Sequence, residues 1–528
     1  MLPSNAAVHI LVFATVLALL STTIQQGIPG GDSGELVAEG CLNGVAHPPG
    51  YPLYISLVRS ILYLFPFPTY TPALVSNLLS AVFASLAAVH ISLCVDTLMR
   101  HYHFPPLSIA VGCVVASVGF ATSQLQWLYS IGSEVFALNN CLCTCVVYLY
   151  IRYMCASHAA TRRSSMVQGS FMAGLCLSNQ HTSILFLLVI ILAIVVDSVS
   201  KQEFTPFLFL QLILAGMLGL SPYVLLYRST TTLGSWGDTS TLGGLWVHVL
   251  RREYGTFSLS PTDFQAEGWM ERTMAYLADT RQDLGLSGYF LAVGGVCLTL
   301  LHRPLTVTKD THTVVQRIVL VVCCMWCFYL AVFHYLSNLP LDNPMAYEVH
   351  RRFWMQPNIV ISIFLGLGTC HAVQKWTQVF KPLPSTSNLH RVLGYCLAGI
   401  LPLYLLGWTS HSMELYSKMS SMNSNQGRYF QRFGRESLKA VESNQKSLLI
   451  SSTDINWNSI RYLQSCEGVS LPSVVHVSLQ IYPFPWFSRQ QHLYDSDVVW
   501  PPVLDDASMT KNSVGKRVAV FFFFIGWE

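Results

Sequence analysis

The stretch TSILFLLVIILAIVVDSV, residues 182–199, is apolar from Ile184 to Val196, and Asp197 near its end is its one charged residue. A run of this length can cross the hydrocarbon core of a bilayer, which needs about 20 residues. The composition agrees, because 52% of the 528 residues are hydrophobic and only 11% are charged. Soluble domains carry about 25% charged residues. The sequence therefore predicts a polytopic membrane protein.

Similar apolar runs lie on both sides of this segment. With a length of roughly 17–23 residues each, they predict about eleven membrane helices and an all-α fold. The predicted spans are residues 7–24, 72–95, 106–122, 136–151, 167–179, 182–199, 205–227, 287–302, 317–335, 353–372 and 391–409. The run 53–66 contains Arg59 and ends in FPFP. We interpret it as an interfacial or re-entrant helix.

Basic residues predict the orientation, because short cytosolic loops carry an excess of lysine and arginine. With a cytosolic N-terminus, each short even-numbered loop contains a cation; Arg152, Arg162 and Arg163 share one of them. The loops 25–52 and 228–286 and the region after residue 410 then lie in the lumen. The first run lacks a basic n-region, which disfavours a cleaved signal peptide, and cleavage would leave the first loop luminal in any case.

Net charge and cysteine usage argue against two other classes. A net charge of +3 gives no electrostatic case for a nucleic-acid partner. Most of the 15 cysteines lie in apolar runs such as CLCTC and CCMWC, which favours small membrane-helix residues over zinc ligands in a polar shell. Cys41 and Cys466 are the two in predicted luminal segments. A disulfide between them is one option that the sequence alone does not decide.

The first predicted luminal loop contains GGDSGELVAEGCLNGVAHPPGYPLY, residues 30–54. Its glycines allow sharp turns and close approach to a ligand. If a helix begins near Ser33, Asp32 would cap it and Glu35 would lie in its first turn, which is a purely structural role. The loop, however, emerges at the membrane surface, and the prolines of HPPGYP restrict its backbone. We therefore treat Asp32 and Glu35 as candidate catalytic acids.

Further polar residues gather on the same predicted side of the membrane. The candidates for a substrate pocket are Glu134, Asn139, Asn179, Gln180, His181, Trp236 and Asp238. The candidates for binding a phosphate are Arg351 and Arg352, with Arg251, Arg252 and His47 as further candidates. Each of these residues alone fits a solvated loop or an interfacial anchor.

Taken together, these side chains suit one kind of reaction. An acid can take the proton from an incoming hydroxyl. Arginines can bind a phosphate and neutralise the charge that grows on it as it leaves. The pattern thus favours transfer of a sugar from a lipid phosphate to a hydroxyl group.

Four segments carry a resemblance to a known family. They are the loop 30–54, GSEVFALNN (132–140), LSNQHTS (177–183) and SWGDTSTLGGLWVHVLRREYGTF (235–257). In this order they resemble the multipass protein O-mannosyltransferases of the GT-C superfamily, over roughly residues 8–485. Essential acids of that superfamily lie in the first luminal loop, where Asp32 and Glu35 match them.

The resemblance implies more than a fold. It implies the endoplasmic reticulum membrane, with a cytosolic N-terminus and a luminal C-terminus, and dolichyl-phosphate-mannose as the donor. The implied acceptors are Ser/Thr hydroxyls of IPT domains in plexins and in receptors of the hepatocyte-growth-factor-receptor type. A luminal C-terminal domain of tetratricopeptide-like helices is implied as well.

The domain organisation follows from the spans and from the resemblance. Residues 1–409 are predicted to form a GT-C transmembrane catalytic domain and 410–485 a mostly helical luminal region. That region looks truncated, because the family's C-terminal domain is longer. Residues 486–528 read as a divergent tail, which ends in a run of phenylalanines.

The expected mechanism is a single displacement with inversion. Asp32 would act as the base and Glu35 would orient the sugar or the acceptor, or the two roles would be exchanged. No metal or cofactor is expected, although the paired acids could suit Mg²⁺ or Mn²⁺. Two alternatives are a non-catalytic scaffold or chaperone and a lipid or solute transporter. Transport is disfavoured because few ionisable groups fall at the centres of the spans.

Overall fold

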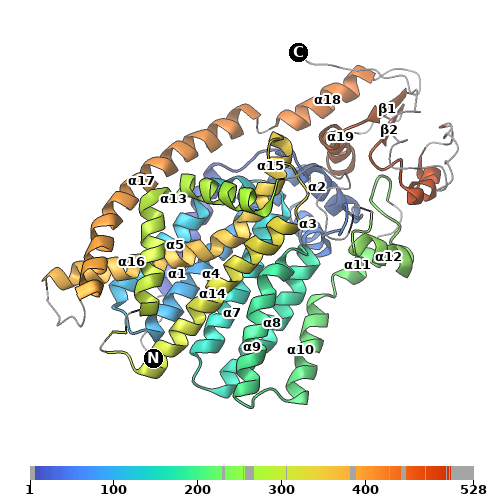
Figure 1. The fold of residues 1–528 in the computed structure, drawn as a ribbon. Helices are drawn as coiled ribbons and strands as arrows, with labels where there is room; N and C mark the ends of the chain where they lie inside the picture. The colour runs from blue at the N-terminus through green and yellow to red at the C-terminus, as the bar shows by residue number, and fades with distance from the viewer. Residues whose placement is uncertain are drawn as a thin grey trace.

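The computed structural model describes residues 6–500, except 229–231, 254, 256–266, 302, 305, 381–387, 427, 442–446, 470, 472, 495, 497 and 499. Long helices form a bundle, and shorter elements gather at one of its ends, the loop end (Figure 1). At the loop end, α2 and α3 lie near α18, α19 and the two strands. The described structure is mostly helical, so the predicted all-α fold class is confirmed.

The first part of the chain supplies twelve helices up to residue 249. They are α1 (Ala6–Thr22), α2 (Ser33–Leu42), α3 (Pro52–Leu64), α4 (Pro72–His101), α5 (Pro106–Ala121), α6 (Gln124–Ser130), α7 (Val135–Cys155), α8 (Ala159–Asn179), α9 (Ser183–Ser200), α10 (Pro206–Gly219), α11 (Tyr223–Arg228) and α12 (Leu242–Val249). Several begin with proline, whose fixed φ suits the first helical turn, where no partner for its missing N–H is needed.

The second part of the chain completes the bundle and adds the strands. It contains α13 (Trp269–Leu301), α14 (Lys309–Leu336), α15 (Pro344–Arg351), η1 (Arg352–Trp354), α16 (Met355–Phe380), α17 (Asn388–Gln426), α18 (Tyr429–Val441), β1 (Ser447–Ser451), α19 (Asp454–Cys466), β2 (Val474–Ser478), η2 (Pro485–Arg489) and η3 (Gln491–Leu493). Helix α13 changes direction at Gly285, where φ is +63°. Glycine adopts this left-handed conformation without steric cost.

Seven helical segments in the described part of the chain are long and apolar enough to cross a membrane, or eight if the bent pair α5 and α6 forms one span. They include α4, α7, α9, α13, α14, α17 and the continuous segment Pro344–Thr377. Helices α1 and α10 are apolar but shorter. Every predicted span overlaps a helix, which confirms the multipass architecture, while the count of eleven stays a prediction.

Several predicted boundaries differ from the helices. The expected span 205–227 is interrupted, because α10 ends at Gly219 and α11 begins at Tyr223. Helix α17 continues through the predicted domain boundary at 410 to Gln426. Beyond it, β1 and β2 pair in parallel on either side of α19 in the chain. The tetratricopeptide-like arrangement stays a prediction.

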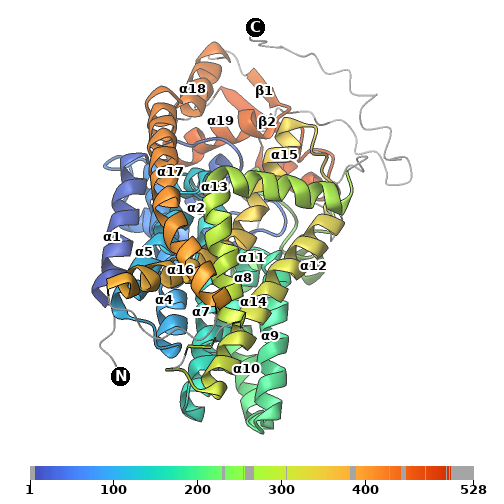
Figure 2. The same cartoon turned by 60° about the vertical axis from the view of Figure 1, so that its left-hand side comes forward.

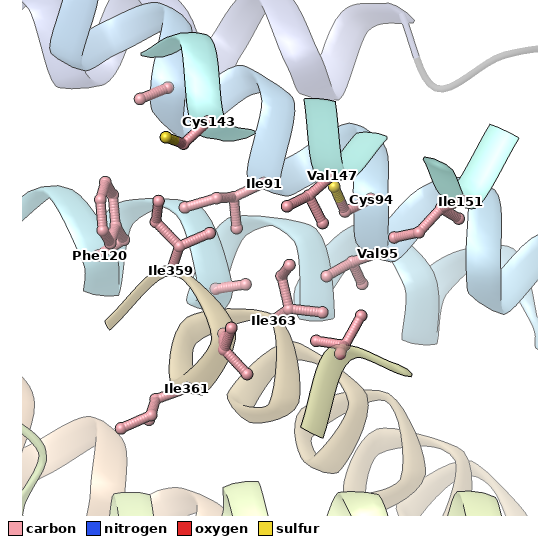
Figure 3. Close-up of a cluster of buried hydrophobic side chains, with 14 of the residues drawn as sticks. Ile91, Cys94, Val95, Phe120, Cys143, Val147, Ile151, Ile359, Ile361 and Ile363 are labelled. Atoms are coloured by element: carbon pink, nitrogen blue, oxygen red, sulfur yellow. The ribbon is translucent and has the colours of Figure 1, made fainter. Parts of the chain in front are cut away.

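The core of the bundle joins α4, α5, α7 and α16. Figure 3 shows Ile91 and Cys94 of α4, Val147 of α7 and Ile363 of α16 pointing into one buried apolar cluster. Cys94 and Cys143 are fully buried there, which agrees with the prediction that these cysteines are apolar packing residues. Such an interior positions the loop end rigidly because it is close-packed.

Two helix crossings depend on glycine. A Cβ on Gly174 of α8 would lie 2.9 Å from the Cα of Gly219 on α10, and a Cβ on Gly295 of α13 would lie 2.6 Å from the Cα of Gly368 on α16. Small residues let membrane helices approach closely, because dispersion contacts rather than the hydrophobic effect hold them together. Larger side chains at these positions would separate the helices.

Candidate active site at the first loop

Helix α2 begins at Ser33, and Asp32 occupies its N-cap position, as the structural interpretation of the loop expects. The Asp32 side chain makes no capping hydrogen bond. Its Oδ2 instead accepts a hydrogen bond of 3.1 Å from Nη1 of Arg352. The arginine, which is 320 positions away in the chain, competes successfully for the carboxylate because it offers a charged donor.

Glu35 holds the second half of the loop against α2. Its Oε1 accepts from the backbone N–H of His47 at 2.6 Å, and its Oε2 lies 2.8 Å from Nδ1 of the same histidine. The Tyr51 hydroxyl lies 3.1 Å from Nε2. Burial favours neutral His47, but Tyr51 and the Glu35 carboxylate outweigh it and hold the pKa of His47 well above 6.5. These two neighbours therefore favour the charged form of the imidazole.

Glu134 and Arg352 complete the group around Asp32. Oε1 of Glu134 accepts from the backbone N–H of Asp32 at 3.2 Å, and the Arg352 guanidinium lies 5.2 Å from the centre of the Phe136 ring. Burial, and then the neighbouring Asp32 carboxylate, raise the pKa of Glu134 to about 8. Glu134 is thus a neutral acid at pH 7, next to a charged one.

Asp32 itself stays ionised. Burial favours its neutral form, but the Arg352 guanidinium and the charged His47 outweigh this effect and hold the pKa of Asp32 below its ordinary value. We call Asp32, Glu35, His47, Glu134 and Arg352 the Asp32 cluster. The first loop, the start of α7 and the segment between α15 and α16 each contribute to it. The arrangement offers an accessible carboxylate beside a guanidinium.

Three members of the cluster could also approach one metal ion. Ligand atoms of Asp32, Glu35 and His47 lie within 4.8 Å of one another. A metal needs a neutral imidazole and a free carboxylate. Here the imidazole of His47 is hydrogen-bonded to Glu35, and Arg352 is hydrogen-bonded to Asp32. The donor types would suit a divalent cation, but their present pairing favours an ion-pair network.

The two consecutive arginines have different surroundings. Arg352 joins the Asp32 cluster, whereas Nε of Arg351 lies 2.8 Å from Asp279 and its Nη1 lies 2.9 Å from Glu348. Consecutive residues of a helix point about 100° apart, because a turn takes about 3.6 residues. Of the two predicted phosphate ligands, only Arg352 faces Asp32.

The further candidates for binding a phosphate, Arg251 and Arg252, follow the end of α12. Arg251 has a left-handed backbone with φ of +53°, and Arg252 is exposed. Burial and the nearby charge of Arg251 lower the pKa of His181 to about 4. The Nε2 of His181 lies 2.6 Å from the Tyr223 hydroxyl. Arg251 therefore lies beside the turn between α8 and α9.

Two other predicted pocket residues lie next to the cluster. Nδ2 of Asn179 donates to the Val135 carbonyl at 3.1 Å, which places it directly next to Glu134. The Trp236 ring lies edge-on to His47 at 6.4 Å. Asn139 and Gln180 are buried, and their hydrogen bonds go to residues outside the cluster.

Asp238 makes its contacts outside the Asp32 cluster. Its carboxylate pairs with the Arg489 guanidinium of η2 and accepts from the Ser240 hydroxyl. It thus connects the loop that follows α11 to the C-terminal segment. We therefore assign Asp238 a structural role at this connection.

A second group of residues at the loop end was not expected from the sequence. Glu39 of α2 pairs with Arg461 of α19, and its Oε2 accepts from the Ser235 hydroxyl at 2.7 Å. The disulfide that the sequence left open is formed between Cys41 and Cys466, with a Cα–Cα distance of 5.6 Å. We call these five residues the Glu39 clamp. The one sequence signal was the spacing of Glu35 and Glu39, which places them on one helix face.

Helix α19 also packs directly against the start of α2. A Cβ on Gly34 would lie 2.9 Å from the Asn458 carbonyl oxygen, so glycine is required for this close approach. Asp454 begins α19 with an exposed side chain. Partial burial and the Glu35 and Asp32 carboxylates raise its pKa to about 6. Asp454 is a further acid near the cluster that the sequence did not reveal.

The fold and the cluster define a class of protein. This is a multipass helical membrane protein that carries acids and an arginine where its loops meet one end of the bundle. The crystal structure of ArnT from Cupriavidus metallidurans bound to undecaprenyl phosphate has a similar fold, with a TM-score of 0.51. It is 11% identical, and the match covers 89% of each chain. The likeness shows a GT-C-type fold.

Comparison with sequences finds one matching family model and similar proteins. Residues 32–203 match the model of the protein O-mannosyl-transferase TMEM260 N-terminal domain, beginning at Asp32. Protein O-mannosyl-transferase TMEM260 of Mus musculus is 32% identical over 484 residues, which cover 90% of this chain and 63% of the mouse protein. The Dictyostelium discoideum protein of the same name is 27% identical over 502 residues, 92% of this chain and 59% of its own length.

These matches confirm the resemblance found in the sequence. The chain is similar to these two proteins and spans about three fifths of their length. The match to the N-terminal domain model covers residues 32–203.

Proposed function

We propose that this chain is a glycosyltransferase of the endoplasmic reticulum membrane. It moves mannose from dolichyl-phosphate-mannose to Ser/Thr hydroxyls of luminal protein domains. The names of the relatives and the GT-C-type fold support the reaction class. The observation that carries the proposal is the Asp32 carboxylate, which is 27% exposed and lies 3.1 Å from the Arg352 guanidinium.

Asp32 is the better candidate for the base. Its Oδ2 is bonded to Arg352, whereas its Oδ1 has no hydrogen-bond partner among the described residues. Glu35 uses both carboxylate oxygens on His47. This difference supports Asp32 as the group that contacts the acceptor and Glu35 as the group that holds the loop in place.

The reaction is a single displacement. Asp32 takes the proton of the acceptor hydroxyl while the acceptor oxygen attacks the anomeric carbon of mannose. The bond from that carbon to the phosphate oxygen breaks, and its electron pair leaves with dolichyl phosphate. Because the donor sugar is β-linked, inversion gives an α-mannoside.

Arg352 and Glu134 are proposed to stabilise the leaving phosphate. Nε of Arg352 and Oε2 of Glu134 are buried without a hydrogen-bond partner among the described residues. A guanidinium can neutralise the growing charge, and a neutral carboxylic acid can donate a hydrogen bond to a phosphate oxygen. Arg352 thus serves as the phosphate ligand, while Arg351 remains in its pairs with Asp279 and Glu348.

The proposed chemistry needs no metal. The positive charges of Arg352 and His47 already balance the acids in the cluster. We expect full transfer in the presence of EDTA. Loss of transfer in EDTA, with recovery on addition of Mn²⁺ or Mg²⁺, would contradict this part of the proposal.

The proposed acceptors are IPT domains of plexins and of receptors of the hepatocyte-growth-factor-receptor type. The decisive experiment incubates the purified full chain with labelled dolichyl-phosphate-mannose and such a domain. Transfer of label to the domain is expected, and the Asp32→Asn variant serves as the negative control. Binding of the donor without any transfer would favour a scaffold, and movement of the lipid across vesicles would favour a transporter.

A further inference from the structure

A cavity at the loop end is lined by none of the residues of the Asp32 cluster. It has a volume of about 740 Å³. It lies between the end of α2, the end of α3, the start of α4 and the end of α19, where the Cys41–Cys466 disulfide forms part of its wall. Figure 1 shows α3 beside α2 at this end of the bundle. The proposed transfer reaction makes no use of this space.

Among the described residues that line the cavity, Arg59 of α3 is the charged one, and none is acidic. Arg59 is exposed and forms no salt bridge with any residue that the structure describes. A guanidinium in such a setting attracts an anionic group, and phosphate suits its forked donors.

The rim of the cavity is aromatic and strongly exposed. The exposed fractions are 87% for Tyr63, 68% for Leu64, 44% for Phe65 and 43% for Phe67. Aromatic rings of this kind are enriched where a membrane meets water, at the level of the lipid headgroups. An exposed apolar group of this size is stable in that zone because one side contacts lipid and the other contacts water.

The position along the chain agrees with this depth. Helix α3 is 13 residues long, too short to span a bilayer. Helix α4 begins at Pro72 and is a 30-residue candidate span. The aromatic segment thus immediately precedes the point at which the chain enters the membrane, which places the mouth of the cavity at the membrane surface.

We propose that this cavity binds the phosphate headgroup of a membrane glycerophospholipid. Arg59 holds the phosphate, while Tyr63, Phe65 and Phe67 contact the glycerol and upper acyl region. The bound lipid fastens α3 to the membrane surface next to α2. The proposal goes beyond the transfer reaction, and lipid binding can be measured without mannosyl transfer.

The test measures lipid retention by the full chain. Protein in mild detergent is equilibrated with vesicles of phosphatidylcholine and phosphatidylserine, and retained phospholipid is counted by native mass spectrometry. The Arg59→Gln variant should bind its most tightly held phospholipid about fivefold more weakly, because a surface arginine contributes about that factor. Arg59→Lys should retain part of the binding. Arg432→Gln, which changes an exposed arginine on α18, should behave as the wild type.

Three outcomes would overturn the proposal. Equal retention by Arg59→Gln and Arg432→Gln would remove Arg59 from any lipid site. Displacement of the lipid by millimolar inorganic phosphate would indicate a site for free anions. Weaker capture of an acceptor domain by Arg59→Gln, with unchanged lipid retention, would indicate a polypeptide surface. None of these readouts requires mannosyl transfer. A negative result for lipid binding would therefore not contradict the proposed function, which is tested by the transfer experiment.

Discussion

Two acid–arginine pairs lie at opposite ends of the short helix α2, and they differ in burial. Asp32 and Arg352 are 27% and 16% exposed, whereas Glu39 and Arg461 are 0% and 4% exposed. Arg352 holds the pKa of Asp32 below its ordinary value, but burial raises that of Glu39 in spite of Arg461. The same pair of side-chain types is therefore accessible for chemistry at one end and sealed within the structure at the other.

The two ends depend on each other through α2. The Glu39 clamp connects α2 to α19 by an ion pair and a disulfide, and Gly34 packs against Asn458 of α19. The C-terminal segment therefore sets the position of the helix that carries Glu35 and follows Asp32. The comparison predicts that changes at Asp32 affect turnover and that changes at Glu39 affect stability.

The largest effect is expected from Asp32→Asn. Removal of a general base should lower the turnover of mannosyl transfer by about 10²–10⁴-fold, while the thermal midpoint shifts little because the pair is partly exposed. Transfer is measured at equal protein concentration. Glu436→Gln, on an exposed pair with Lys439, is the matched control. Undiminished turnover in Asp32→Asn would remove Asp32 as the base.

Glu39→Gln should lower the stability of the protein, whereas Asp32→Asn should lower its turnover. Glu39→Gln leaves the Arg461 charge buried without its anionic partner, which should lower the free energy of unfolding by about 3–5 kcal/mol. The measurement is the thermal midpoint in detergent. Replacement of both partners by apolar residues, Glu39→Leu with Arg461→Met, should recover part of the loss. A normal midpoint for Glu39→Gln alone would show that the pair contributes little.

Loss of the disulfide should be somewhat less severe. The bond joins residues separated by 425 positions, and removing such a cross-link should lower the free energy of unfolding by about 2–5 kcal/mol. The double variant Cys41→Ser with Cys466→Ser is compared with Cys94→Ser, which removes a thiol in the bundle core. If reducing agent destabilises the double variant as strongly as the wild type, another bond is responsible.

The smallest expected effect is a change in pH dependence. The folded-state pKa of Glu134 is raised to about 8, so its carboxyl is protonated below that pH and ionised above it. Ionisation removes a hydrogen-bond donor beside the phosphate and adds repulsion toward Asp32. Transfer should therefore fall about fourfold between about pH 7 and pH 8.5, as for one essential protonated group.

Glu134→Gln provides the check on this assignment. Glutamine keeps a neutral hydrogen-bond donor at all of these pH values, so the alkaline fall in kcat/KM should become flatter. An alkaline limb that is identical in wild type and Glu134→Gln would assign the titration to another group.

Much of the architecture was predictable because membrane insertion depends on local, additive hydropathy. Each predicted span overlaps a helix, and the start of α2 at Ser33 followed from the residues around it. The interruption at Gly219 was missed, because a turn of a few residues inside an apolar run changes the summed hydropathy very little.

The sequence by itself determined that this is a multipass helical protein with an acidic, glycine-rich first loop. Only the tertiary structure decided which arginine meets Asp32, that Glu39 and Arg461 form a buried pair, and that Cys41 bonds Cys466. The reason is the range of the interactions. Hydropathy acts within one helix, whereas each of these contacts joins segments more than 300 residues apart and depends on how the whole bundle brings its loops together.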